Sequence, residues 1–155
     1  MFFLKFYTKA QISRAHLAWN LLFQQKIYLS FNTLDMKFSK SELADLFKAS
    51  YNHKLFDVQR FHINKKLSDE LVKVYTLNDS KDVIVVHRGS DDMNDWVDNG
   101  LHLAGLDLTL TKTYKMHLRR QLKAVKKYGK DNIICLGHSR GGLYSQQFYK
   151  DKLCN

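Results

Sequence analysis

A short apolar run that stops at a serine between two glycines constrains this chain more than any other feature. Residues 133–136 read Ile-Ile-Cys-Leu, and Gly-His-Ser-Arg-Gly follows at 137–141. A strand that turns at once into a helix strains the central residue of the turn and crowds the residues two positions before and after it, so both must be small. The sequence therefore predicts a strand, a tight turn centred on Ser139 and a following helix.

Such a turn gives its central serine a chemical role. It lifts the Ser139 hydroxyl clear of the sheet edge and places the backbone N–H of Arg140 at a helix N-terminus, facing any negative charge that develops there. Gly137 and Gly141 supply the two small positions. Ser139 is therefore a candidate nucleophile, although an ordinary glycine-rich turn from a strand into a helix gives the same pattern.

A second motif lies upstream of the first. An apolar run over 83–86 leads into His87-Arg88-Gly89-Ser90, and Asp95-Trp96 follows a few residues later. The order and spacing of the two motifs resemble the class 3, or fungal-type, lipases of the α/β-hydrolase fold, over about residues 67–150. In that family an apolar strand precedes Arg-Gly-Ser/Thr and an Asp/Asn-Trp pair, and a helix and a strand then lead to Gly-His-Ser-Leu-Gly-Gly.

The resemblance implies a fold and an activity. It implies an α/β domain with a mostly parallel sheet, which hydrolyses carboxylic esters of lipids through an acyl-enzyme on Ser139 and needs no cofactor. Ser90 and the backbone N–H of Arg140 take the positions of the oxyanion donors. Asp95 and Trp96 fall in the lid or substrate-facing loop. The remaining motif positions are Arg88, Gly89, Gly137, His138 and Gly141.

Two positions depart from the family pattern. Arg140 stands where leucine is usual, and His87 stands where an aromatic residue such as phenylalanine is usual. A backbone donor tolerates the first change, although a long arginine side chain can alter the acyl pocket.

The general base of a serine hydrolase is missing from its expected position. In this fold an aspartate and then a histidine follow the nucleophile, whereas Asp151 is the one acidic residue after Ser139 and no histidine follows it. We expect Asp151 about three turns along the helix, pointing away from the hydroxyl, and His138 on the other side of the turn. His87 and His102 could reach the Ser139 hydroxyl only from a direction that is unusual for this fold. The chain is therefore either a hydrolase completed by a second chain or a further C-terminal part, or a catalytically inactive remnant.

The remaining pattern predicts one partial lipase-like domain over 36–155. Its expected elements are a helix over 42–51, a loop or short strand over 52–66, strands over 71–77 and 83–87 joined as a hairpin, and a helix over 111–130. The last helix ends at Gly129, ahead of the 133–136 strand, which gives a parallel βαβ unit. Its predicted apolar stripe consists of Tyr114, Leu118, Leu122 and Val125.

Charge is distributed unevenly along the chain. The net charge is +10, yet residues 67–110 carry three basic and nine acidic residues, and residues 111–155 carry eleven basic and two acidic ones. The basic helix over 112–130 makes a module that binds anionic lipid or nucleic acid the main alternative to an enzyme, beside an ordinary solvated face. The sequence has no zinc-ligand spacing, aromatic RNA-binding signature or helix-turn-helix pattern, which argues against nucleic acid.

Residues 1–35 form a separate basic, amphipathic extension. Within 1–34 there are four basic and no acidic residues, and no apolar run is long enough to span a membrane. The segment also lacks the form of a secretory signal. An organelle presequence, an interfacial helix at an anionic membrane and a helix packed on the domain all fit this pattern. Met36 is an alternative start of the chain.

The two cysteines, Cys135 and Cys154, do not make a disulfide framework. We therefore expect free thiols, a reducing compartment and an intracellular, cytoplasmic location. The seven histidines are scattered without a ligand spacing, so no metal site is predicted.

Overall fold

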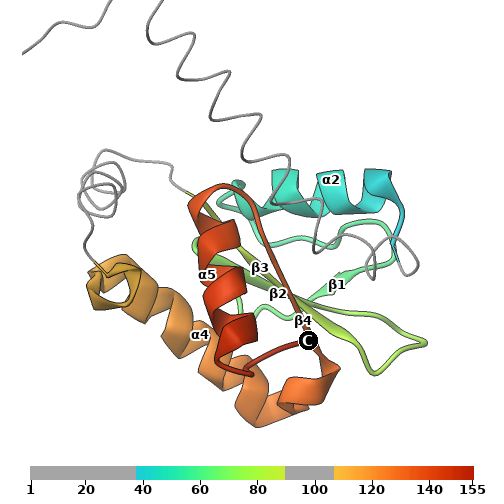
Figure 1. Cartoon of the computed structure of the whole chain (residues 1–155). Helices are drawn as coiled ribbons and strands as arrows, with labels where there is room; N and C mark the ends of the chain where they lie inside the picture. Colours follow the sequence, from blue (N-terminus) through green and yellow to red (C-terminus); the bar gives the residue numbers. More distant parts are fainter. Residues whose placement is uncertain (1–37, 90–106) are drawn as a thin grey trace, which may run out of the picture. The chain divides into compact units, whose positions relative to one another are not determined.

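The computed structural model describes residues 38–89 and 107–155 (Figure 1). Residues 41–155 form one structural unit. The segment 1–35, Met36 and residues 90–106 lie outside the described residues, and the predictions made for them stay predictions. The elements, in chain order, are helix α2 (Lys40–Ser50), strands β1 (His62–Ile63), β2 (Val72–Thr76) and β3 (Val83–His87), 3₁₀ turn η1 (Leu108–Leu110), helix α4 (Lys112–Tyr128), 3₁₀ turn η2 (Lys130–Asn132), strand β4 (Ile133–Gly137) and helix α5 (Arg140–Lys150).

The predicted local elements are confirmed. Helices α2 and α4 match the ranges 42–51 and 111–130, β1 is the short strand expected within 52–66, and β4 and α5 frame the turn at Ser139. Among the helices of the described ranges, none combines the length and the apolar character needed to cross a membrane.

The four strands form one sheet in the order β1-β2-β3-β4. β2 pairs with both β1 and β3 in antiparallel fashion, whereas β3 and β4 run parallel. The described sheet is therefore mixed, and the prediction of a mostly parallel sheet is wrong for this part of the chain. Connection length is the reason, because the short turn between Thr76 and Val83 joins antiparallel neighbours, while α4 supplies the crossover that a parallel pair needs.

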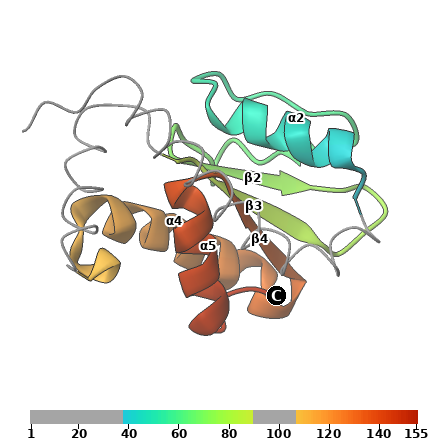
Figure 2. The ribbon, with the colours of Figure 1, turned by 45° about the horizontal axis from the view of Figure 1, so that its top comes forward.

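Helices cover both faces of the sheet (Figure 2). Side chains alternate along each strand, so Val83, Val85 and His87 of β3 point to the face covered by α4 and α5. Ile84 and Val86 are buried on the opposite face, which α2 covers. The α4/α5 face holds a continuous apolar cluster whose buried members include Val72, Val74, Val83, Val85, Ala124, Ile133, Tyr144 and Phe148.

Helix α4 begins and ends as predicted, and its predicted apolar stripe is confirmed except at one position. The Thr111 hydroxyl accepts a hydrogen bond from the Tyr114 backbone N–H, and Gly129 ends the helix with a φ of 81°. Leu122, predicted to lie in the apolar stripe, is 46% exposed. The prediction was wrong at Leu122 only, because Tyr114 is buried and Leu118 and Val125 pack against the apolar cluster. It also missed two polar side chains that find buried partners here. The buried residues of α4 are Tyr114, His117, Gln121 and Ala124.

The chain after α5 folds back along β4. Cys154 forms a disulfide with Cys135, with the two Cα atoms 6.0 Å apart, and the Asn155 backbone N–H donates to the Ile133 carbonyl at 2.8 Å. The expectation of free thiols is therefore wrong, because the return of the chain through α5 brings together two cysteines 19 residues apart. Disulfides persist in oxidising compartments, so the argument for a reducing compartment loses its basis.

Candidate functional site

The turn between β4 and α5 holds a serine in an unusual backbone conformation. β4 ends at Gly137, α5 begins at Arg140, and Ser139 between them has φ 56° and ψ −128°. A non-glycine residue in such a region costs on the order of 1–3 kcal/mol, which the surrounding structure must offset. The half-buried Ser139 thus lies beyond the carboxyl ends of the parallel strands β3 and β4.

Close backbone contacts require the two glycines of the motif. A Cβ on Gly141 would overlap the carbonyl oxygen of His87, and a Cβ on Gly137 would overlap the main chain of Gly141. Helix α5 can therefore leave β4 against the end of β3 only if both positions lack a side chain. The requirement for small residues, predicted from the sequence, is confirmed.

The end of β3 brings the second motif to the same point. Arg88 donates its backbone N–H to the Leu71 carbonyl at 2.9 Å, and Gly89 follows. A Cβ on Gly89 would stand 3.0 Å from the Cβ of Ser139 and 2.6 Å from the carbonyl oxygen of His138. The two sequence motifs therefore meet at the serine. Four predicted positions, Ser90, Asp95, Trp96 and His102, lie outside the described residues.

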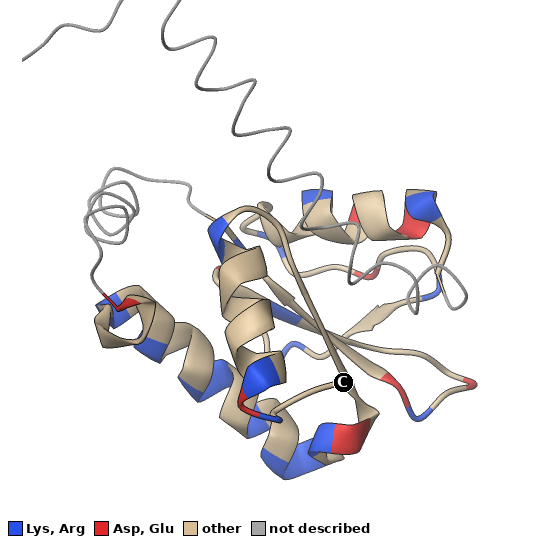
Figure 3. Ribbon diagram, viewed as in Figure 1, with Lys and Arg blue, Asp and Glu red and all other residues tan. Residues whose placement is uncertain are grey.

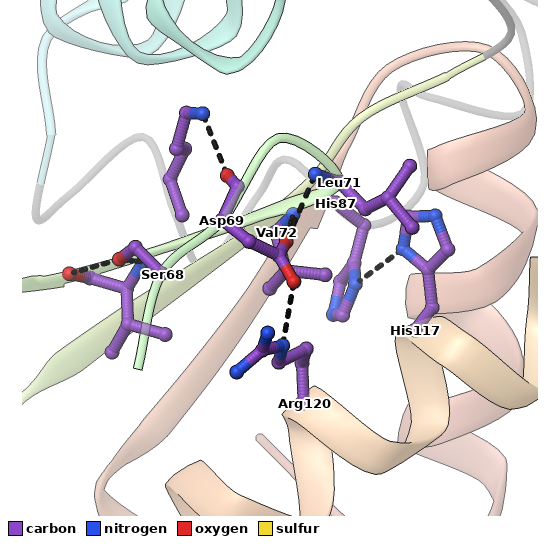
Figure 4. Close-up of polar contacts among 9 residues, drawn as sticks. Ser68, Asp69, Leu71, Val72, His87, His117 and Arg120 are labelled. Carbon is purple, nitrogen blue, oxygen red and sulfur yellow. Dashed lines mark hydrogen bonds and ion pairs between the residues drawn. The ribbon is translucent and has the colours of Figure 1, made fainter. Parts of the chain in front are cut away.

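A polar cluster anchors the strands that carry Gly89. The Asp69 carboxylate accepts hydrogen bonds from the backbone N–H groups of Leu71 and Val72 at 2.9 and 3.0 Å, and it pairs with Arg120 of α4 at 2.6 Å (Figure 4). The Lys73 ammonium donates to the Asp69 carbonyl at 2.7 Å, and burial lowers the pKa of Lys73. These contacts tie α4 to the start of β2, which pairs with the end of β3.

Helix α5 presents its first backbone amides at the turn. Gly141 and Gly142 donate to the carbonyls of His138 and Ser139 at 3.0 and 2.9 Å. Arg140 is the first residue of the helix, so its N–H lies at the positive end of the helix dipole, and this predicted position is confirmed. The Arg140 side chain is only 4% exposed, with its guanidinium carbon 5.8 Å from the centroid of the Tyr144 ring. It packs against α5 itself, which gives no support to a role in an acyl pocket.

Tyr51, which the sequence motifs do not include, lies beside the serine. Its hydroxyl oxygen is 3.0 Å from Nδ1 of His138 and 2.5 Å from the Cβ position of Gly89. His138 is exposed, and its ring also contacts the ring of Phe47 in α2. No local sequence pattern could have indicated this contact, because 87 residues separate Tyr51 from His138.

Buried polar side chains form a hydrogen-bonded chain on the other side of the turn. Nδ1 of His87 is 3.1 Å from Nδ1 of His117 (Figure 4), and Nε2 of His87 is 3.2 Å from Oε1 of Gln121. The Gln121 amide donates to the Leu153 carbonyl at 2.9 Å. Because an amide oxygen only accepts, we assign the His87 proton to Nε2, which leaves Nδ1 to accept from His117. Each hydrogen bond in this series is then donated in the same direction, from His117 to His87, from His87 to Gln121 and from Gln121 to the C-terminal tail.

Burial keeps both histidines of this chain neutral. Loss of hydration lowers the pKa of His87 to about 4, and the hydrogen bond to Gln121 opposes that shift only in part. Loss of hydration also lowers the pKa of His117 well below its usual value, and positive charge on His87, Arg140 and Arg88 adds to the effect. Since both ring nitrogens of His87 are engaged in the core, this histidine does not provide a base for Ser139.

Asp151 lies at the opposite end of α5 from the serine, as expected. It caps the C-terminus of the helix and accepts hydrogen bonds from the side chains of Gln147 at 2.9 Å and Tyr114 at 3.5 Å. Residues 38–89 and 107–155 therefore do not complete the family's order of serine, aspartate and histidine. The same residues contain no group of three His, Cys, Asp or Glu side chains that could hold a metal ion.

Comparison of the chain with protein-family models, with curated proteins and with solved structures finds no match. The family resemblance therefore rests on the two sequence motifs alone. Function has to be inferred from the chemistry of this site.

Proposed function

We propose that the chain is a lipase-like serine hydrolase, similar to the class 3 lipases of the α/β-hydrolase fold, which cleaves carboxylic esters of lipids. The observation that carries the proposal is the meeting of the two motifs. Ser139 is held at φ 56°, the Gly89 backbone lies against its Cβ, and α5 begins directly after it. The proposal places this chemistry on a small mixed α/β fold.

The proposed reaction passes through an acyl-enzyme. The Ser139 hydroxyl oxygen attacks the ester carbonyl carbon, and the hydroxyl proton passes to a base. The Arg140 backbone N–H and Ser90 stabilise the oxyanion, and one such donor contributes roughly 10²–10³ in rate. Collapse of the tetrahedral intermediate expels the alcohol and leaves the acyl group on Ser139, and water then releases the acid.

A catalytically inactive remnant is the alternative within the same fold. It would keep the strained turn and lose the base, and a second chain or a further C-terminal part could restore that base in an active assembly. The two possibilities differ in one measurable property, which is the reactivity of the Ser139 hydroxyl.

Covalent labelling by a fluorophosphonate probe measures that reactivity. An activated serine attacks the phosphorus, so we expect stable labelling of the full chain and its loss in Ser139→Ala. Ser145→Ala is the matched control, because Ser145 lies on the same helix with its hydroxyl bonded to the Gly141 carbonyl at 3.0 Å. A folded chain that resists the probe would be the inactive remnant.

The surface of α4 favours a second candidate function, binding to anionic lipid. The helix carries seven lysines and arginines and no acidic residue (Figure 3). Met116 and Leu122 are 41% and 46% exposed among them, which suits shallow insertion into a lipid interface. This basic helix would then bring the chain to a membrane surface whether or not Ser139 is reactive.

Co-sedimentation with phosphatidylserine vesicles tests this second candidate. Replacing Lys115 and Lys123 of α4 by glutamate should abolish binding, whereas Lys81→Glu, in the turn after β2, should leave it unchanged. Binding that weakens with added salt and persists in Ser139→Ala supports a lipid-binding module. Equal binding to neutral phosphatidylcholine vesicles contradicts it.

A further inference from the structure

We propose that Tyr51 passes the proton of Ser139 to His138, so that His138 acts as the general base through the phenol hydroxyl. This inference rests on the proposed serine hydrolase function. It supplies the base that the family's order of residues does not provide within the described ranges. It also gives a chemical role to His138, which the resemblance gives only as a motif position, and to Tyr51, which belongs to neither motif.

The groups of the relay lie around one point. The hydroxyl oxygen of Tyr51 lies 2.5 Å and the Cβ of Ser139 lies 3.0 Å from the position that a Cβ on Gly89 would occupy. The phenol and the serine side chain therefore approach the same small space beside Gly89. Rotation about one bond, Cα–Cβ of Ser139, moves the serine hydroxyl around this space. The relay requires the rotamer in which that hydroxyl approaches Tyr51.

The second half of the relay is already a hydrogen bond. The Tyr51 hydroxyl oxygen is 3.0 Å from Nδ1 of His138, and the two rings meet edge to face with centroids 5.9 Å apart. A neutral imidazole with its proton on Nε2 accepts at Nδ1, so the phenol donates its proton to His138. In the proposed step the phenol oxygen accepts the proton of Ser139 through a lone pair.

The proton balance is complete without a further reactant. As Oγ of Ser139 bonds to the acyl carbon, its proton moves to the Tyr51 oxygen, and the Tyr51 proton moves to Nδ1 of His138. The phenol stays neutral and the imidazole becomes imidazolium. When the ester C–O bond breaks, the proton returns through Tyr51 to the leaving oxygen. The same steps with water in place of the alcohol release the acid.

The surroundings of His138 suit this task. A general base acts within hydrogen-bond reach of its proton or through one intervening water, and here the phenol takes the position of that water. His138 is exposed, so its imidazole exchanges protons with solvent. Helix α2 holds both partners, since Phe47 contacts the His138 ring and the Tyr51 backbone N–H donates to the Lys48 carbonyl at 3.3 Å.

The rate of fluorophosphonate labelling, measured at a series of pH values, tests the relay. Tyr51→Phe keeps the ring and removes only the hydroxyl, and His138→Gln removes the base. We expect each variant to label roughly 10²-fold more slowly, with the double variant no slower than either, because the two residues form one path. The rise in rate with pH should vanish in both. Tyr149→Phe and His53→Gln are exposed controls that should behave as the unmodified chain.

The outcomes separate the relay from the function on which it rests. An unmodified chain that resists the probe overturns both. If the unmodified chain labels, Ser139→Ala does not, and the Tyr51 and His138 variants keep the rate and pH profile, the hydrolase stands and the relay is wrong. Losses that add up in the double variant also contradict the relay, because they indicate two independent effects.

A solvent isotope measurement needs no variant and so remains decisive if the variants fail to fold. The unmodified chain is labelled in mixtures of light and heavy water. Two protons move together in the relay, so the labelling rate should fall along a curve as the deuterium content rises. A straight line, which indicates one transferred proton, overturns the relay.

Discussion

Two sets of polar side chains lie at the serine turn, one with a buried pair of histidines and one with a single exposed histidine. They differ in the properties that govern proton transfer. His87 and His117 lie on the α4/α5 side, fully buried, with His87 held between His117 and Gln121. His138, in the turn between β4 and α5, is exposed, and its Nδ1 lies 3.0 Å from the hydroxyl oxygen of Tyr51, which follows α2. Desolvation disfavours the charged form of the buried pair, whereas the His138 ring is in contact with solvent. The environment, and not the residue type, therefore decides which histidine can act as a base.

The buried set also accounts for the departure from the family pattern at His87. The His87 ring lies 5.0 Å from the ring of Phe148 and 5.4 Å from that of His117, measured between centroids. It thus occupies an aromatic site in the core, as phenylalanine would, and adds two hydrogen bonds. This comparison indicates that the buried set serves stability, and the proposed relay assigns chemistry to the exposed set.

The largest expected effect is a loss of stability in acid. The pKa of His87 is about 4 in the folded chain and 6.5 when unfolded, so below about pH 6.5 the unfolded chain takes up a proton that the folded chain refuses. The contribution of His87 is complete above about pH 6.5 and falls by about 3 kcal/mol towards pH 4. The lowered pKa of His117 acts in the same direction. Urea unfolding at a series of pH values measures the slope.

A matched pair of variants separates this effect from general acid unfolding. Replacing His87 and His117 together by phenylalanine should flatten the dependence between about pH 6.5 and 4, because both titrating groups are gone. His53→Gln, at an exposed position after α2, should leave it intact. An unchanged slope in the first variant would show that the buried histidines do not control acid stability.

The next effect concerns the point where the two regions meet. In Gly141→Ala the new Cβ would overlap the carbonyl oxygen of His87, so α5 must move away from β3. We expect a loss of about 2–3 kcal/mol in the free energy of unfolding together with a loss of probe labelling. Gly142→Ala is the control, because its Cβ would stand 3.2 Å from the Gly137 carbonyl oxygen and needs only a small adjustment. Equal stability of the two variants would contradict the close contact.

A smaller effect should follow from breaking the buried chain at its middle. Gln121→Leu leaves the Nε2–H of His87 and the carbonyl of Leu153 without their partner. An unsatisfied buried group costs about 1–3 kcal/mol, so we expect a loss of about 2 kcal/mol in chemical unfolding. Gln146→Leu, on an exposed position of α5, should be close to neutral. If Gln121→Leu left the free energy of unfolding unchanged, these buried hydrogen bonds would contribute little to stability.

The smallest effect on stability is expected for Tyr51→Phe, the variant that should slow probe labelling strongly. Tyr51→Phe removes a hydrogen bond to an exposed imidazole, so the free energy of unfolding should fall by less than about 1 kcal/mol. Thermal unfolding measures this change on the sample used for labelling. A large loss of stability would show that Tyr51 has a structural role like that of the buried set. Slow labelling of Tyr51→Phe would then no longer support the relay.

The parts that could be predicted from the sequence depend on short-range geometry. A strand, a tight turn and a following helix could be predicted from the apolar run 133–136 and the glycines at 137 and 141. The reason is that the backbone crowding at Ser139 involves close neighbours in the chain. Gly129 and Thr111 mark the ends of α4 for the same local reason. Periodicity did less well inside α4, where His117 and Gln121 are buried because residues far along the chain satisfy their polar atoms.

Short-range sequence patterns were enough to predict the local elements, the tight turn at Ser139 and the need for glycine on both sides of it. The mixed sheet, the pairing of Cys135 with Cys154 and the contact of Tyr51 with His138 became visible only in the folded chain. The physical reason is that a turn or a helix end is set by a few neighbouring dihedral angles. The desolvation of a histidine, or the partner of a cysteine or a phenol, depends on segments that the fold brings together from distant parts of the chain.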